Sequence, residues 1–208
     1  MGKIKNILFD FGGVILTLSP ETATRRFEEL GLPDAGKHLD IYTQSGIFGD
    51  LECGRISDKE FVNELSRLAG RELTWEQCQH AWLGYCKEVP GRNLEALLRL
   101  RNEGYRTILV SNTNPFMMKW ALSDSFDGQG QPLGHYLDAL YMSYRCGAMK
   151  PDAAFFNHVL RSEDINPAET LFLDDGRRNV EAAQKMGINT MLTVNGDDWT
   201  QEIYNYLK

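Results

Sequence analysis

Short apolar runs that end abruptly at a polar residue or a glycine constrain this chain more than any other sequence feature. The first, 5–9 (KNILF), stops at Asp10 and is followed by Phe11-Gly12-Gly13. Apolar runs without polar alternation are typical of strands covered on both faces, as in a parallel sheet. Comparable runs lie at 106–110, 170–173 and 189–194, with a weaker one at 139–143.

Helical patterns alternate with these runs. Apolar residues recur at helical spacing in a segment that ends near Gly104, in one that begins at Pro151, and in one that ends at Gly187. Proline suits a first helical position, and glycine suits the position just after a helix. Because strands and helices alternate in order, the sequence predicts an α/β fold with a doubly wound, Rossmann-like parallel sheet.

Residues 19–88 interrupt this alternation with four helical stretches and no convincing strand. One stretch begins at Pro20, and a less periodic one spans about 34–44. Two others open with capping-box sequences, at Ser57 and Thr74. We therefore expect an all-helical insertion in a Rossmann-like core. The expected domains are a core of residues 1–16 and 90–208 and a cap domain of residues 17–89.

Composition limits the classes of partner. The 208 residues are 42% hydrophobic and 25% charged with a net charge of −7, which argues against disorder and against a basic nucleic-acid face. The cysteines and histidines match no zinc or disulfide pattern. The N-terminal apolar run is broken by Asp10 and is too short to span a membrane. We expect a cytoplasmic protein with no nucleic-acid, membrane or obligate protein partner.

Polar residues stand where the predicted strands end. In a doubly wound sheet, ligands bind beyond the carboxyl ends of the strands. Three carboxylates there would repel one another and need a cation, and hard oxygen ligands favour Mg²⁺. The residues at this edge are Asp10, Ser111-Asn112, Asp174-Asp175 and, before the next helix, Lys150.

These residue types suit phosphoryl chemistry. The carboxylate of Asp10 can act as a nucleophile. Ser111 can donate a hydrogen bond to a phosphate oxygen, and Lys150 can neutralise developing charge. Gly12 and Gly13 let the backbone approach a phosphoryl group closely.

Each piece also has an ordinary structural interpretation. Asp10-Phe11-Gly12-Gly13 could be a turn, and Asp174-Asp175 could cap a helix. Ser111-Asn112 and Lys150-Pro151 carry little information alone. Their joint occurrence, in order and at predicted strand ends, favours one site.

The segments ILFDFGGVI, LVSNTN, MKP and FLDDGRRN resemble the four successive motifs of the haloacid dehalogenase superfamily. The resemblance covers 4–16 and about 94–194, and the helical block lies where that superfamily inserts a cap. LECGRISDKEF and VSNTN resemble the bacterial α-glucose-1-phosphate phosphatases and the phosphatase domain of soluble epoxide hydrolases. This implies a magnesium-dependent phosphatase that acts on a small phosphorylated metabolite.

The resemblance also implies roles for individual residues. Asp10 would be the nucleophile and form an aspartyl-phosphate intermediate. Asn179 falls where many relatives carry a further carboxylate. The implied metal ligands are Asp10, the Gly12 carbonyl and Asp175, with Asp174 supporting or sharing the metal. The implied phosphoryl-binding residues are Ser111, Asn112 and Lys150, with backbone groups at Gly12 and Gly13.

Gly12 departs from the superfamily pattern. Most of its phosphatases have a second aspartate at this position, which protonates the leaving group and then activates water. Such a general acid–base typically increases the reaction rate about 10²–10⁴-fold. Without it, the rate should depend strongly on the leaving group, which favours anomeric sugar phosphates over alkyl phosphates.

Other interpretations remain open at this stage. Gly12 is compatible with a catalytically weak regulatory or binding protein. A metal-independent 2-haloacid dehalogenase uses the same aspartate nucleophile, although the acidic pair at 174–175 favours a metal. A receiver domain also clusters Asp, Ser or Thr and Lys but lacks such an insertion. The candidate specificity residues of the cap are Phe48, Arg55, Trp82 and Tyr85.

Overall fold

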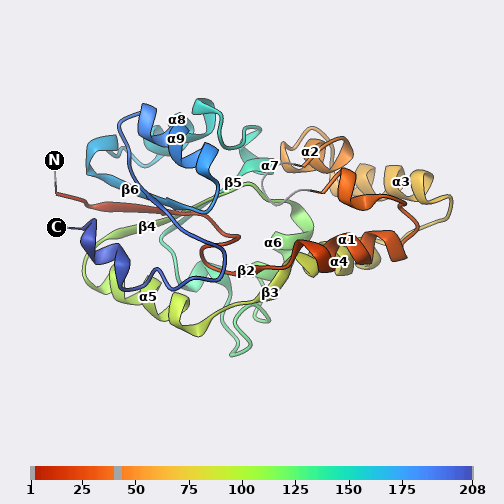
Figure 1. Ribbon diagram of the computed structural model, residues 1–208, viewed down its shortest axis with the longest axis horizontal. Helices are drawn as coiled ribbons and strands as arrows, with labels where there is room; N and C mark the ends of the chain where they lie inside the picture. Colours follow the sequence, from red (N-terminus) through yellow and green to blue (C-terminus); the bar gives the residue numbers. More distant parts are fainter. Residues whose placement is uncertain (1–2, 40–43, 208) are drawn as a thin grey trace.

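The computed structural model describes residues 3–39 and 44–207, and its centre is a parallel sheet of five strands in the order β5-β4-β1-β6-β7 (Figure 1). Every apolar run expected to be a strand is one, with ends that differ by at most two residues. The strands are β1 (Asn6–Phe9), β4 (Arg106–Ser111), β5 (Ala139–Met142), β6 (Thr170–Asp174) and β7 (Asn189–Leu192).

Helices cover both faces of this sheet, as the doubly wound prediction requires (Figure 1). On one face, α5 (Gly91–Asn102) packs with the C-terminal segment, and Leu97 and Trp199 are buried there. On the other face lie α8 (Ala153–Ser162) and α9 (Arg177–Lys185), which bury Phe156 against Phe172 of β6. Both termini lie at the end of the sheet away from the insertion.

The predicted helix ends are confirmed at Gly104 and Gly187, which follow α5 and α9 with positive φ angles. The predicted start of α8 at Pro151 is wrong. The helix begins at Ala153, because the side chain of Asp152 accepts a hydrogen bond from the Ala154 amide and caps it.

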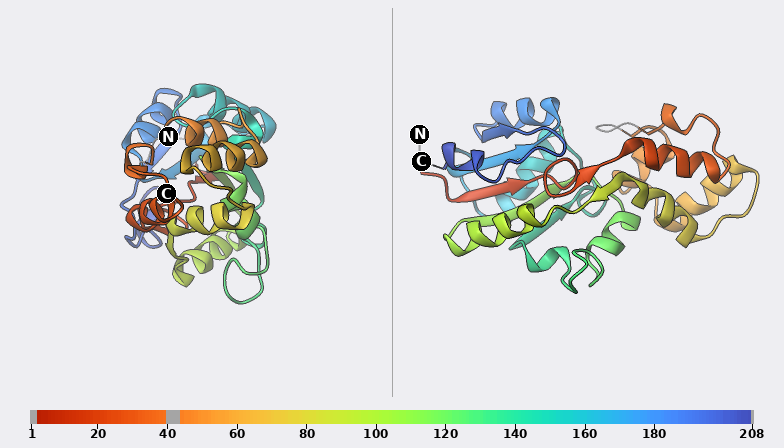
Figure 2. Two further views of the ribbon diagram at one scale, coloured as in Figure 1. Left: turned by 90° about the vertical axis from the view of Figure 1, so that its right-hand side faces the viewer. Right: turned by 60° about the horizontal axis from the view of Figure 1, so that its bottom comes forward.

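The insertion consists of helices from 20 to 85, and it extends from one end of the sheet (Figure 2). Both capping boxes, at Ser57 and Thr74, are formed. Its elements are α1 (Pro20–Glu29), the 3₁₀ helix η1 (Ala35–Lys37), α2 (Ile47–Glu52), α3 (Asp58–Ala69), α4 (Trp75–Trp82) and the 3₁₀ helix η2 (Leu83–Tyr85).

Two details of the insertion differ from expectation. The stretch expected at 34–44 contains only η1, residues 40–43 lie outside the described residues, and α2 was not expected. The 19–88 block also contains a strand, β3 (Cys86–Glu88), which pairs antiparallel with β2 (Thr17–Leu18). Strands of two or three residues are too short to show a period of two. The division at 17 and 89 stays a prediction.

Aromatic rings form the interior of the insertion. The Phe48 ring lies 5.1 Å from Phe27, 5.2 Å from Phe61 and 5.6 Å from Trp82, between ring centroids. Phe116 joins this cluster from α6 (Pro115–Ala121), which follows β4. The cluster therefore connects the insertion to the sheet, and Phe48 is one of its buried members rather than a substrate contact.

Replacement of Phe48 by alanine should lower the free energy of unfolding by about 3–5 kcal/mol, because it leaves a cavity among three aromatic rings. Chemical denaturation measures this change. Leu68→Ala, at a position on α3 that is 41% exposed, is the control and should shift the free energy by no more than about 0.5 kcal/mol. Equal effects of the two substitutions would contradict the buried role of Phe48.

Candidate active site

Asp10 follows β1, where the strand order reverses. The next strands in the chain, β4 and β5, lie on one side of β1, and the last two, β6 and β7, lie on the other side. Phe9 lies opposite Leu109 of β4 and Leu173 of β6, so Asp10 stands within one residue of the ends of both neighbouring strands. A doubly wound sheet binds its ligands at this place, beyond the carboxyl edge.

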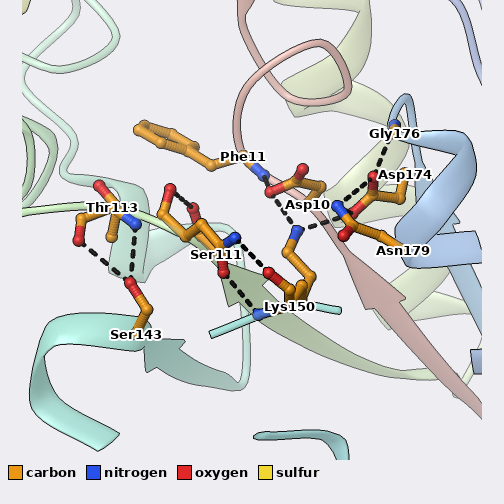
Figure 3. A network of polar contacts seen from close by, with 10 residues as sticks. Asp10, Phe11, Ser111, Thr113, Ser143, Lys150, Asp174, Gly176 and Asn179 are labelled. Atoms are coloured by element: carbon orange, nitrogen blue, oxygen red, sulfur yellow. Dashed lines mark hydrogen bonds and ion pairs between the residues drawn. The ribbon is translucent and has the colours of Figure 1, made fainter. Parts of the chain in front are cut away.

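The Lys150 side chain lies between two carboxylates (Figure 3). Its Nζ is 2.8 Å from Asp10 Oδ1 and 2.6 Å from Asp174 Oδ2, and its side chain is 1% exposed. Burial alone lowers the pKa of this ammonium, but the charges of Asp10 and Asp174 outweigh burial and raise it. Lys150 therefore stays protonated, as its predicted charge-balancing role requires.

Asp174 is fully buried and its oxygens already have partners. Oδ1 accepts hydrogen bonds from the Gly176 amide at 2.7 Å and from Asn179 Nδ2 at 3.0 Å, while Oδ2 accepts one from Lys150. The ordinary interpretation of the acidic pair as a helix cap is thus partly right, because Gly176 precedes α9. This arrangement favours support of Lys150 over direct metal binding.

Asp10 presents its two oxygens differently. The Phe11 amide, at 2.7 Å, and Lys150 both donate to Oδ1. Burial raises the pKa of Asp10 well above its usual range, Asp174 and Asp175 add to this, and Lys150 opposes it. Within the described residues both of these contacts go to Oδ1, which leaves Oδ2 available to a ligand.

The environment of the Asp175 carboxylate indicates a cation-binding site. Its Oδ2 is buried without a hydrogen-bond partner among the described residues, and burial together with the charge of Asp174 raises its pKa to about 7. Oxygen atoms of Asp10, Asp174 and Asp175 all lie within 4.8 Å of one another. An uncompensated carboxylate beside two others is costly, and a hard cation with oxygen ligands such as Mg²⁺ fits this donor set.

Gly13 makes room for that donor set. It has a φ of +75°, and a Cβ at this position would lie 2.2 Å from Asp175 Oδ2. The loop therefore requires glycine here for both its conformation and its close approach to Asp175. At Gly12, by contrast, the atoms nearest to an added Cβ belong to the side chain of Leu18, at 3.0 Å.

Asn112 joins the second and third motifs. Its Nδ2 donates to the Lys150 carbonyl at 2.9 Å, and its Oδ1 accepts from the Lys150 amide at 2.8 Å. Since the amide side chain is occupied by this pair of bonds, it positions Lys150, and any phosphoryl contact from Asn112 falls to its backbone. Ser111 is 1% exposed and lines the cavity beside Asp10.

One cavity lies where the carboxyl edge of the sheet faces the insertion. Among the predicted cap residues, Trp82 and Tyr85 line it, whereas Phe48 is in the aromatic interior and Arg55 is exposed and paired with Asp50. The lining residues from β1 and the sheet edge include Asp10, Gly12, Ser111, Asn112, Asn114, Lys150, Asp175 and Asn179. Those from the insertion side include Leu18, Gln44, Glu52, Trp82 and Tyr85.

Sequence reasoning did not single out three polar residues of this cavity, namely Gln44, Glu52 and Asn114. Glu52 lies within LECGRISDKEF, the segment that carried the subgroup resemblance, so a signal was present. Asn114 likewise lies within VSNTN, the other segment of that resemblance. Gln44 had no such signal, because an isolated amide has no periodicity or spacing that marks it.

A family model described as haloacid dehalogenase-like hydrolase matches residues 4–187. The chain belongs to this family. The match spans all four motifs and the insertion, so the resemblance seen in the sequence and the expectation of an enzyme are confirmed.

Individual relatives agree along the whole chain. D-ribitol-5-phosphate phosphatase of Bacteroides thetaiotaomicron is 46% identical over 200 residues, which are 96% of this chain and 97% of the relative. A HAD-like family hydrolase from Porphyromonas gingivalis has a TM-score of 0.94 at 39% identity, over 100% and 99% of the two chains. A HAD family enzyme of B. thetaiotaomicron, solved with magnesium and inorganic phosphate, has a TM-score of 0.90 at 32% identity, over 96% and 98%.

These relatives confirm the predictions of a phosphatase of this family and of Mg²⁺ as its cofactor. An L-2-haloacid dehalogenase is also similar, but at 16% identity and a TM-score of 0.57 it shares the fold alone. Within the described ranges, no helix has the length and apolar character needed to cross a bilayer.

Phosphatase activity should require Mg²⁺ and disappear in EDTA, because three carboxylates cannot otherwise hold a phosphate dianion.

Asp175→Asn should weaken Mg²⁺ binding, measured by calorimetry, by more than the roughly 10–100-fold that loss of an outer-shell partner costs. Asp124→Asn, at an exposed carboxylate, is the control. Unchanged Mg²⁺ affinity in Asp175→Asn would remove this residue from the ligand set.

Proposed function

We propose that this chain hydrolyses the phosphate monoester of a small sugar alcohol, with ribitol 5-phosphate as the first candidate. The observation that carries this proposal is the 46% identity, over nearly the whole of both chains, with a D-ribitol-5-phosphate phosphatase. The cavity supports it, because its insertion side offers polar groups of Gln44, Trp82 and Tyr85 that suit hydroxyl groups.

In the proposed reaction, Asp10 attacks phosphorus. A bond forms between a carboxylate oxygen of Asp10 and phosphorus while the bond to the leaving alcohol oxygen breaks, which produces an aspartyl phosphate and the free alcohol. Water then attacks phosphorus, inorganic phosphate leaves, and the Asp10 carboxylate is restored. Lys150 lies 2.8 Å from Asp10 and can offset the charge that builds up on the transferred group.

The neighbours of Asp10 hold the phosphoryl group. Ser111 donates its hydroxyl, and backbone amides of the loop at Gly12 and Gly13 approach the phosphate. Mg²⁺, held by Asp10, the Gly12 carbonyl and Asp175, supplies charge neutralisation and orientation when bound. Asp174 contacts Lys150 at 2.6 Å, and Asn179 donates a hydrogen bond to Asp174 at 3.0 Å. Both residues therefore act by keeping Lys150 in place.

Anomeric sugar phosphates are the second candidate, and Gly12 favours them. Without a general acid on the nucleophile loop, a more acidic leaving group departs more easily. Ribitol 5-phosphate is by contrast an ester of a primary alcohol, which is a poor leaving group. The two candidates therefore differ in what they require of the residues around the leaving oxygen.

A substrate panel with Mg²⁺ or with EDTA tests the proposal. We expect phosphate release from ribitol 5-phosphate with a kcat/KM at least about tenfold above those for glucose 1-phosphate and glucose 6-phosphate. The highest kcat/KM for glucose 1-phosphate would support the anomeric candidate instead. No turnover of any phosphate would support a binding protein, and halide release from a 2-haloacid in EDTA would support a dehalogenase.

Asp10→Asn should abolish turnover while leaving the fold intact, because asparagine keeps the size of the side chain but lacks the attacking carboxylate. Steady-state kinetics and circular dichroism measure the two properties. Lys150→Ala should also be severe, with Lys119→Ala at an exposed position of α6 as its control. A rate in Asp10→Asn above about a tenth of the wild-type rate would contradict covalent catalysis by Asp10.

A further inference from the structure

Gly12 leaves the nucleophile loop without a group that can protonate the leaving oxygen. The titratable groups that line the cavity among the described residues are Asp10, Lys150, Asp175, Tyr85 and Glu52. The proposed mechanism uses Asp10, Lys150 and Asp175, and the Tyr85 hydroxyl accepts a hydrogen bond from Gln44. Glu52 is the carboxyl group of this lining that has no role so far.

Glu52 is the last residue of α2 and is only 7% exposed. Its neighbours Phe48 and Leu51 on the same helix pack in the aromatic interior, but Glu52 lines the cavity together with Asp10 and Ser111. A carboxyl group at a buried helix end needs a reason to be there, since burial of an acid without a charged partner is unfavourable.

The two residues after Glu52 dock the insertion against the sheet side of the molecule. Cys53 Sγ lies 3.1 Å from Sδ of Met149, the residue that precedes Lys150 in the chain. Gly54 has a φ of +70°, and a Cβ there would lie 2.2 Å from the Tyr144 carbonyl oxygen, so the backbones meet closely. These contacts hold the C-terminal end of α2, and with it Glu52, against the sheet side of the molecule.

The surroundings of Glu52 keep its proton available. Burial raises its pKa to about 7, while a hydrogen bond with the Asn114 side chain and the charge of Lys150 act in the opposite direction. None of the salt bridges found in the described part of the chain involves Glu52. A carboxyl group in this state can give up a proton and take one back near neutral pH.

We propose that Glu52 is the general acid–base of this enzyme and supplies from the insertion what Gly12 lacks. This inference rests on the proposed phosphatase mechanism. In the first step, the Glu52 proton passes to the leaving alcohol oxygen as its bond to phosphorus breaks. In the second step, the Glu52 carboxylate takes a proton from the water that attacks the aspartyl phosphate, so the acid form is regenerated.

The test compares leaving groups in the Mg²⁺-loaded enzyme. For Glu52→Gln, kcat/KM for ribitol 5-phosphate should fall about 10²–10⁴-fold, the usual contribution of a general acid. For 4-nitrophenyl phosphate, whose leaving group needs no proton, it should fall less than about tenfold. Across phenyl phosphates of graded acidity, the dependence of kcat/KM should be shallow in the wild type and steep in Glu52→Gln.

Glu76→Gln, at an exposed position of α4, is the matched control and should leave the series unchanged. Gly12→Asp in the Glu52→Gln background should restore kcat/KM most for phosphates with poor leaving groups, because the atoms nearest to a Cβ at position 12 belong to the Leu18 side chain, at 3.0 Å, which can move.

The outcomes separate the two proposals. An equal loss for every phosphate in Glu52→Gln, or no loss, would overturn the assignment of Glu52, since a structural or hydroxyl-binding role leaves the slope unchanged. A steep dependence already in the wild type would overturn it too and would leave the anomeric candidate standing. Absence of phosphatase activity in the wild type would instead reject the proposed function.

Discussion

The buried ammonium of Lys150 is the interaction on which the rest of the site depends. Asp10 and Asp174 both contact it, at 2.8 and 2.6 Å, in surroundings where an unpaired charge is costly. The surrounding contacts serve to hold this arrangement: Asn112 clamps the Lys150 backbone, and Asn179 holds Asp174. One ammonium cannot balance three carboxylates, and this imbalance explains why the site requires Mg²⁺.

Close backbone approach, achieved by glycine, is the second constraint. Gly13 brings the nucleophile loop against Asp175, and Gly54 brings the insertion against the Tyr144 carbonyl. A side chain at either position would separate surfaces that must touch. The loop after Asp10, Asp175 and the insertion are therefore held in place by close backbone contacts, and the packed aromatic cluster around Phe48 makes the insertion rigid.

The insertion contributes two kinds of chemical group to the cavity. It contributes the polar residues Gln44, Trp82 and Tyr85 to the cavity lining, and it brings one carboxyl group, Glu52, into the same lining. In the proposed mechanism, loss of an acid at position 12 is compensated by a group from another part of the chain. Substrate choice and proton transfer then both depend on how the insertion docks on the sheet.

The sequence by itself determined the five strands of the parallel sheet, the family, and the grouping of Asp10, Ser111, Lys150 and Asp175 at one edge of that sheet. It could do so because buried parallel strands have a recognisable composition and because their carboxyl ends necessarily meet at one edge. Only the tertiary structure decided that Asn112 and Asp174 hold Lys150, that Phe48 is interior, and that Glu52 faces the cavity. Those properties depend on contacts between residues far apart in the chain, and local sequence patterns carry no information about such contacts.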